Sequence, residues 1–323
     1  MKKLLCVILS VLMIGAVLVL ASCEKKPVTL KFGVGVAVTT SASDATEEKN
    51  GSAEVDSTVA VITVGADGKV VACKIDVAQI KAAYTADGKA VATTDFRTKL
   101  EKGTDYGMSK RGVAEWYEQA AAFESVVVGK TLAEVKALVA EGGKGVEEVT
   151  KAGCTITVSE FVKAIEKAFA NLADSNATAE STLKIGMATD QSLKDYDAEA
   201  AKDGTNEIDT TIFAAAVDKD GKVVAVDTDC TQVKFTFDGT GKSTFTATEV
   251  LTKRQKGNDY GMSKTGKTEW FAQADAFETL CIGKTAAEIV KLAAEGGKGT
   301  EAVQTAGCTI TVTGFTSAAS KIG

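Results

Sequence analysis

The sequence predicts an α+β protein made of two tandem copies of a small domain, each with an antiparallel hairpin and packed helices. Two observations carry this prediction. The second half of the 323-residue chain repeats the first, and each half passes from strand-like alternation to helix-like periodicity. The expected layout is a leader at 1–22, a tether at 23–28, the first copy at 29–173, a linker at 174–181 and the second copy at 182–323.

The repeat keeps a nearly constant offset along the chain. Thr29 corresponds to Thr182, an offset of 153 residues, and Asp105 corresponds to Asp259, an offset of 154. A period this long indicates tandem domains, because solenoid repeats span only about 20–50 residues. The polar run at 174–181 is typical of a linker.

Within each copy a hairpin precedes several helices. Residues 57–75 alternate as two strands around a turn at 66–68, and 210–226 do the same in the second copy. Helices are expected at 113–126, then after Thr131, which has Glu134 at the capping-box position, and again at 159–172. The corresponding last segment, 314–322, is shorter and is expected to be frayed.

Composition excludes several classes of function. The chain has no histidine, which removes Ser-His-Asp and Cys-His catalysis and most zinc sites. The net charge of −6 argues against nucleic acid as a partner. The cysteines form no CxxC pair, so we expect small buried thiols at Cys73, Cys154, Cys230, Cys281 and Cys308. No catalytic constellation and no metal site is predicted.

The N-terminus has the pattern of an export signal. Lys2 and Lys3 precede an apolar stretch at 4–20, and Leu20-Ala21-Ser22-Cys23 resembles the lipobox of bacterial lipoproteins. In such proteins the cysteine that follows the cleavage site carries the lipid, which here implies Cys23. The alternative is a transmembrane anchor. Either interpretation places the rest of the chain outside the cytoplasm and tethered to a membrane.

One short motif ends both copies. Ala-Gly-Cys-Thr-Ile-Thr-Val occurs at 152–158 and at 306–312, and in the first copy a helix-like pattern follows it. A glycine and two hydroxyls before a helix start can hold a phosphate, because the glycine allows close backbone approach and the first helical N–H groups are free. Thr-Ile-Thr-Val is equally an ordinary β-strand pattern.

The hairpin with its DGKVV sequence, the helices and the final hydroxyl motif together resemble the FMN-binding domain family. The family motif, Asp-Gly-x-Ser-Gly-Ala-Thr-x-Thr, carries FMN on its last threonine, which implies covalent attachment at Thr157 and Thr311. Gly153, Thr155, Gly307 and Thr309 match the rest of the motif. Three positions depart from it: alanine replaces the serine, cysteine replaces the alanine, and Val149 and Val303 stand three residues before the serine position.

The whole chain also resembles the flavinylated lipoproteins of extracellular electron transfer. That resemblance implies an electron carrier on the outer face of the cytoplasmic membrane, with two covalent FMN groups and no enzyme activity of its own. Its partners would be a membrane quinol or flavin donor, an extracellular acceptor and a flavin-transferring enzyme. The rival hypothesis is a surface lipoprotein that binds a small ligand or a protein without a redox group.

A flavin ring needs an apolar wall and a few hydrogen-bond donors. The candidate residues are Tyr106, Met108, Tyr260, Met262, Gln119 and Gln273. Trp116 and Trp270 are candidates too, although their helical spacing favours the core. Gln119 and Gln273 are either exposed helix residues or hydrogen-bond partners of the ring.

Overall fold

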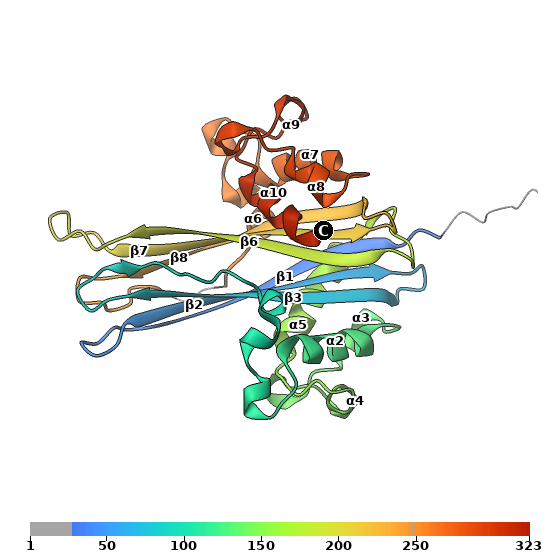
Figure 1. Cartoon of the computed structure of the whole chain (residues 1–323), viewed down its shortest axis with the longest axis horizontal. Coiled ribbons are helices and arrows are strands. Elements are labelled where there is room, and N and C mark those ends of the chain that lie inside the picture. Colours follow the sequence, from blue (N-terminus) through green and yellow to red (C-terminus); the bar gives the residue numbers. More distant parts are fainter. Residues whose placement is uncertain (1–27, 247–248) are drawn as a thin grey trace, which may run out of the picture.

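The computed structural model describes residues 28–246 and 249–323, and it shows two antiparallel sheets, each with its own set of short helices (Figure 1). The mixed α and β content agrees with the predicted fold class. The predicted leader and Cys23 lie outside the described residues. Within the described ranges, every helix is too short or too polar to cross a bilayer.

The first sheet is a meander of three long strands with a short strand at each edge. Its spatial order is β4 (Ala90–Val91), β3 (Val70–Tyr84), β2 (Gly51–Val64), β1 (Lys31–Ser43) and β5 (Ala173–Asp174). The β2–β3 hairpin contains the predicted turn, where Gly68 adopts a φ of 76°. The predicted linker is partly ordered, because Asp174 belongs to β5 and Ala177 is buried.

Strand β1 was not predicted, because Gly33 and Gly35 weaken its strand pattern. Helix packing explains both glycines. A Cβ at Gly33 would lie 2.2 Å from the carbonyl oxygen of Ala168, and one at Gly35 would lie 2.0 Å from that of Ala164. The last helix of the first half therefore rests directly on the backbone of β1.

The second sheet repeats the three long strands in the order β6 (Thr182–Lys194), β7 (Gly204–Val217) and β8 (Val223–Phe237). Its β7–β8 pair has a register shift between Ala216 and Val217, and the β2–β3 pair has one between Thr63 and Val64. We call residues 28–174 the first unit and residues 182–323 the second unit.

The helices and 3₁₀ turns (η) follow one order in both units. In the first unit they are α1 (Lys99–Lys102), η1 (Gly103–Tyr106), η2 (Ser109–Arg111), α2 (Trp116–Val127), α3 (Leu132–Lys136), η3 (Glu141–Gly143), α4 (Glu147–Lys151) and α5 (Ser159–Ala170). In the second unit they are α6 (Lys253–Lys256), η4 (Gly257–Tyr260), η5 (Ser263–Thr265), α7 (Trp270–Cys281), α8 (Ala286–Val290), η6 (Glu295–Gly297), α9 (Glu301–Thr305), α10 (Thr313–Ala319) and η7 (Ser320–Ile322).

Two helix predictions can be checked directly. The capping box of Thr131 and Glu134 is present at the start of α3. The expectation of a frayed C-terminal segment is wrong, because Phe315 and Ala318 of α10 and Ile322 of η7 are buried.

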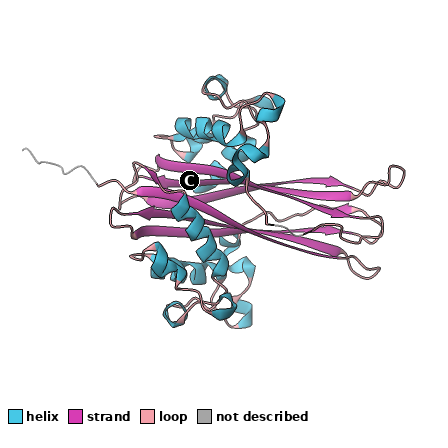
Figure 2. Cartoon of the chain, turned by 180° about the vertical axis from the view of Figure 1, so that it is seen from behind, coloured by secondary structure: helices cyan, strands magenta, loops and turns pink. Residues whose placement is uncertain are grey.

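The two sheets pack face to face, and the helices cover the outer face of each (Figures 1 and 2). Strand β2 shows the alternation: Val55, Val59 and Val61 belong to the core between the sheets, whereas Ala60 and Ile62 belong to the core under the helices. The order of layers is therefore helices, sheet, sheet, helices.

The contacts between the units have an approximate two-fold symmetry. Tyr84 stacks on Phe237, its counterpart at an offset of 153, with ring centroids 4.5 Å apart. Lys167 donates to Gln255 at 3.3 Å, and Lys321 pairs with Glu101 at 2.9 Å. At the offset of 154, Lys167 corresponds to Lys321 and Glu101 corresponds to Gln255, so the two contacts are equivalent. The units therefore contact each other as the subunits of a symmetric dimer do.

Candidate functional site

The hydroxyl motif is a loop in both units, lying between α4 and α5 and between α9 and α10. The β-strand interpretation is therefore wrong: Thr157 makes a single bridge, to Lys144, and the corresponding bridge joins Thr311 to Lys298. The motif residue Thr157 lies two positions before the start of α5, as a phosphate site at a helix start requires.

The motif glycine is required by backbone conformation. Gly153 has a φ of 109° and Gly307 one of 108°, which side chains with a Cβ rarely adopt. A Cβ at Gly153 would meet nothing nearer than Ala122, at 3.8 Å. Backbone conformation therefore already requires a glycine here, and the close approach to a phosphate stays a prediction.

Gln119 fixes the motif loop from α2. Its Oε1 accepts hydrogen bonds from the backbone N–H of Thr155 at 2.8 Å and from the Thr155 hydroxyl at 3.0 Å. Its Nε2 donates to the carbonyl of Ala114 at 2.9 Å, and the side chain is buried. Gln119 is thus not an exposed helix residue, and both ends of its amide are engaged within the protein.

The second unit repeats this arrangement. Gln273 is buried, and its Oε1 accepts from the N–H and hydroxyl of Thr309 at 2.8 and 3.0 Å. Both glutamines are therefore positioning residues for the loop that carries Thr157 and Thr311.

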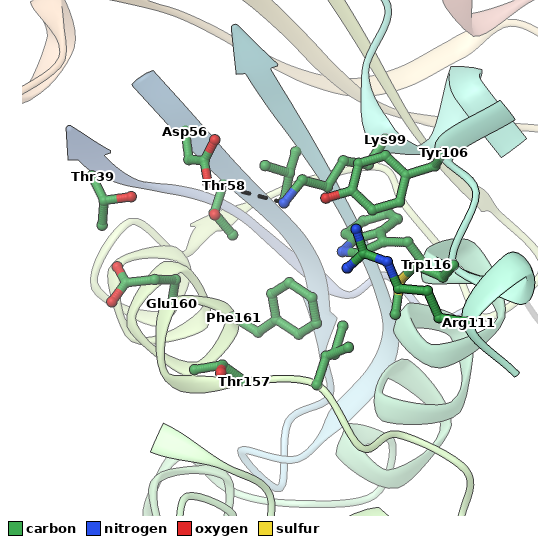
Figure 3. Close-up of a pocket in the computed structure, with 13 residues that line it drawn as sticks. Thr39, Asp56, Thr58, Lys99, Tyr106, Arg111, Trp116, Thr157, Glu160 and Phe161 are labelled. Carbon is green, nitrogen blue, oxygen red and sulfur yellow. Dashed lines mark ion pairs between the residues drawn. The ribbon is translucent and has the colours of Figure 1, made fainter. Parts of the chain in front are cut away.

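Thr157 is exposed and lies at the edge of a cavity of about 350 Å³, the first cavity (Figure 3). Tyr106, Met108 and Trp116 form part of its wall together with Phe161. The structure thus brings together side chains that are distant in sequence but were all candidates for one site. The remaining lining residues are Thr39, Asp56, Thr58, Val77, Lys99, Arg111, Ile156 and Glu160.

The wall that carries Tyr106 and Met108 is fixed by a buried carboxylate. Glu115 accepts hydrogen bonds from the N–H of Met108 and of Ser109, each at 3.0 Å, and from the Ser109 hydroxyl. These bonds, that of the hydroxyl first, lower the pKa of Glu115. The Tyr106 hydroxyl donates to Oε1 of Gln79 at 3.2 Å. Hydrogen bonds to Glu115 and Gln79 therefore fix the position of the loop that carries Tyr106 and Met108.

Trp116 has two roles. Its side chain is only 3% exposed and belongs to the core under the helices, as its helical spacing indicated. Its indole also forms part of the cavity wall, and the same is true of Trp270 in the second unit. The core interpretation and the wall interpretation are therefore compatible.

The charged side of the first cavity was not identified from the sequence. Lys99 comes from the first position of α1, which Thr98 caps in a capping box with Glu101. Asp56 comes from the helix-facing side of β2, and burial raises its pKa while Lys99 opposes the shift. The repeat offset gives Lys253 and Asp209, so the repetition itself could have singled out this pair.

The second unit has a second cavity of about 760 Å³ with an adjoining hollow of about 180 Å³. Lys253, Trp270 and Thr311 line both parts. Counterparts of Tyr106 and Met108 line the larger part. Besides the three shared residues, the larger part is lined by Tyr260, Met262, Lys267, Lys298, Thr309 and Ile310. The smaller part is lined by Asp190, Asp209, Thr211, Cys230, Gly314 and Phe315.

The five cysteines of the described residues are unpaired. Cys154, Cys230, Cys281 and Cys308 are buried, Cys73 is half-buried, and all five are free thiols. Burial raises the pKa of each, to about 11 for Cys308. Among the described residues no group of histidine, cysteine and carboxylate side chains is arranged to hold a metal ion.

Comparison with known proteins finds no matching family model, no similar curated protein and no similar solved structure.

Proposed function

We propose that the chain is a lipid-anchored electron carrier outside the cytoplasm, built from two copies of one domain, and that Thr157 and Thr311 carry FMN through phosphoester bonds. The observation that carries the proposal is made twice in the molecule. In each unit an exposed threonine of the motif lies at the edge of a cavity walled by tyrosine, methionine and tryptophan.

The cavities suit a flat aromatic ring. Their volumes of about 350 and 760 Å³ lie in the range of small-molecule sites. Aromatic and thioether side chains favour stacking on a conjugated ring. A bound flavin supplies reversible uptake and release of electrons, and the protein supplies the wall, the orientation and the local charges.

The surroundings of Thr157 favour an esterified phosphate. Helix α5 has twelve residues, begins at Ser159, and has no side-chain cap, so its first N–H groups and its dipole are directed at the motif loop. Lys144, paired through its backbone with Thr157, places its Nζ 3.4 Å from the carbonyl oxygen of Thr155. Both features favour a negative charge at this position.

Two of the three departures from the family motif fall at buried positions, whereas the alanines that replace the serine, Ala152 and Ala306, are exposed. Cys154 and Cys308 are fully buried, and a cysteine there serves as a small apolar residue much as alanine would. Val149 and Val303, where the family has aspartate, are also fully buried in the cores of their units. The flavin-transferring enzyme of this system must then recognise the exposed hydroxyls without that carboxylate.

The two sites face opposite sides of the molecule. The first cavity opens on the helix-covered face of β2 and the second on that of β7, with both sheets between them. Packed sheets are about 10 Å apart, so the two rings would be separated by more than that distance. Each site is accordingly open to a partner of its own, one a membrane quinol or flavin donor and the other an extracellular acceptor.

Mass spectrometry of the chain from its native host tests the proposal. We expect the mass of two FMN groups on the intact chain, located on the peptides that contain Thr157 and Thr311. Thr157→Val and Thr311→Val should each remove one group. Thr150→Val, which changes an exposed hydroxyl on the neighbouring helix α4, should remove none.

Other results would point elsewhere. Unmodified peptides together with a yellow colour that denaturation releases would indicate non-covalent flavin. Unmodified peptides and no flavin in the native protein would contradict the proposal and favour a non-redox lipoprotein that binds a small ligand or a protein partner.

A further inference from the structure

Each cavity is lined by a lysine and by an aspartate whose Oδ1 is buried without a hydrogen-bond partner among the described residues. The Lys99 side chain is 12% exposed, and its Nζ lies 4.0 Å from Oδ2 of Asp56, beyond hydrogen-bond distance. Among residues 28–246 and 249–323 this ammonium has no hydrogen-bond partner within 3.5 Å, and Asp56 is its ion-pair partner. Two aromatic rings also lie near it, since Nζ is 5.5 Å from the centroid of Tyr106 and 6.0 Å from that of Trp116.

The neighbouring carboxylate lacks donors. Oδ1 of Asp56 is buried and has no partner in the described part of the chain, and Oδ2 accepts a single long bond of 3.4 Å from Gln79. A carboxylate can accept about four hydrogen bonds, so most of this capacity is unused.

The second unit has the same unpartnered carboxylate oxygen. Oδ1 of Asp209 is buried without a partner among the described residues, and Oδ2 accepts from Gln232 at 3.0 Å. Nζ of Lys253 lies 5.4 Å from the centroid of Tyr260 and 6.0 Å from that of Trp270. Buried polar groups are nearly always hydrogen-bonded, so the recurrence of the same exception in both cavities calls for a ligand.

We propose that each lysine–aspartate pair is a recognition subsite for the imide edge of a planar ring, meaning a ring N–H flanked by carbonyl oxygens. The lysine supplies donors to a ring carbonyl, and the aspartate accepts the ring N–H. The pyrimidine edge of a flavin has this pattern, and its face would lie against the tyrosine and tryptophan. The inference rests on the proposed function, because it identifies the edge of the flavin to which these residues bind.

The chain carries its own reporter for this test. It has two tryptophans, and Trp116 lines the first cavity while Trp270 lines the second. In the full chain with Trp270→Phe, the fluorescence of Trp116 therefore reports occupancy of the first cavity. Chain produced without the flavin-transferring enzyme is titrated with lumiflavin and with its N3-methyl derivative, which has no imide N–H.

We expect lumiflavin to quench Trp116 and the N3-methyl ring to bind at least tenfold more weakly, since a hydrogen bond to a charged group is lost. Asp56→Asn and Lys99→Met should each weaken lumiflavin binding about tenfold or more. Asp56→Asn should also abolish most of the discrimination between the two rings, while Lys99→Met should retain part of it. Circular dichroism confirms that the variants fold.

Lys151→Met and Glu147→Gln are the matched controls, because they change an exposed lysine–carboxylate pair on α4, outside both cavities. These two variants should leave both titrations unchanged. The same design with Trp116→Phe, Asp209→Asn and Lys253→Met tests the second cavity.

The inference is overturned if both rings quench equally, or if neither ring quenches Trp116. Its failure is distinct from that of the proposed function. FMN on Thr157 and Thr311 by mass spectrometry, with no discrimination between the rings, would reject the subsite alone. Discrimination without FMN on those threonines would reject covalent attachment and retain the subsite.

Discussion

The two cavities share most of their wall but differ in charge. Both are lined by lysine, tyrosine, methionine, tryptophan, isoleucine and threonine at corresponding positions. The first adds Arg111 and Glu160, where the second unit has Thr265 and Gly314. The second adds Lys267 and, in its adjoining hollow, Asp190. Sites that share wall residues but differ in charge are suited to one ligand held under two electrostatic conditions.

The cores of the two units also differ electrostatically. In the first unit Lys74 pairs with Glu124 at 3.2 Å. In the second, Arg254 stands where the first unit has Leu100, and its three guanidinium nitrogens pair with Asp227 at 3.0 Å, Asp275 at 2.7 Å and Glu278 at 2.6 Å. A single side chain therefore compensates three carboxylates, which makes the second unit the more vulnerable to a substitution.

The largest effect is expected from Arg254→Met. Removing one partner of a mostly buried ion pair leaves uncompensated charge, so we expect a loss of about 3 kcal/mol in the free energy of unfolding. Lys74→Met in the first unit should cost about 1 kcal/mol, because the lysine is more solvated and has one partner. Urea denaturation measures both. Equal losses would show that the arginine cluster is not a special feature of the second unit.

The next effect concerns pH. Asp76 is buried beneath α1, where it accepts from the N–H of Val77 at 2.7 Å and of Leu100 at 3.1 Å, and burial raises its pKa to about 6. The folded protein therefore binds this proton more tightly than the unfolded chain. The resulting stabilisation is present at low pH and is lost as the pH rises through about 6, a change of about 3 kcal/mol.

Asp76→Asn should accordingly flatten the decline of unfolding free energy between about pH 4 and about pH 7. Asp229→Asn should flatten it less. Burial also raises the pKa of Asp229, but the nearby Arg254 opposes that shift. Denaturation at several pH values checks this, and identical profiles for wild type and Asp76→Asn would contradict it.

A third comparison uses the buried glutamines. Gln119→Leu removes both bonds to Thr155 and leaves a donor without a partner, at a cost of about 1–3 kcal/mol. Since the loop then loses its fixed position, FMN on Thr157 should fall severalfold while FMN on Thr311 is unchanged. Gln273→Leu should give the reverse pattern. Peptide mass spectrometry measures both, and equal loading at both threonines in either variant would show that the glutamines do not position the loops.

Local pattern predicted part of this molecule. The alternation of apolar and polar residues predicted the β2–β3 hairpin, and the capping box of Thr131 and Glu134 predicted the start of α3. Both signals depend only on residues close in sequence. Strand β1 was not predicted, because its glycines are required by packing against α5, which lies more than a hundred residues away in the chain.

The candidate site was predictable to the extent that the resemblance pointed to it. Thr157 was chosen from the family motif and Tyr106 and Met108 as candidates for the wall of a flavin ring, and the structure places all three in one cavity. Gln119 was assigned to solvent or to a ligand, whereas it bonds to Thr155, 36 residues away. Such a bond depends on how α2 packs against the motif loop, which no local pattern encodes.

The smallest expected effect concerns redox potential and rests on the flavin proposal. The second cavity with its adjoining hollow is lined by three lysines and two aspartates, which leaves one excess positive charge, whereas the first cavity balances Lys99 and Arg111 against Asp56 and Glu160. Reduction adds negative charge, which nearby cations stabilise. We therefore expect the second site to have the higher midpoint potential, by about 30 mV. Spectroelectrochemistry of Thr157→Val and Thr311→Val, each with one site loaded, measures the two values separately.

Glu160 provides the means to narrow that difference. Glu160→Gln removes a carboxylate from the first cavity and should raise the potential of that site toward that of the second. Glu166→Gln is the control, because it neutralises a carboxylate on the same helix that does not line the first cavity. Equal shifts in the two variants would show that the helix as a whole, and not the cavity wall, sets the difference. A shift in Glu160→Gln alone would show that the potential difference originates in the side chain that the second unit replaces with Gly314.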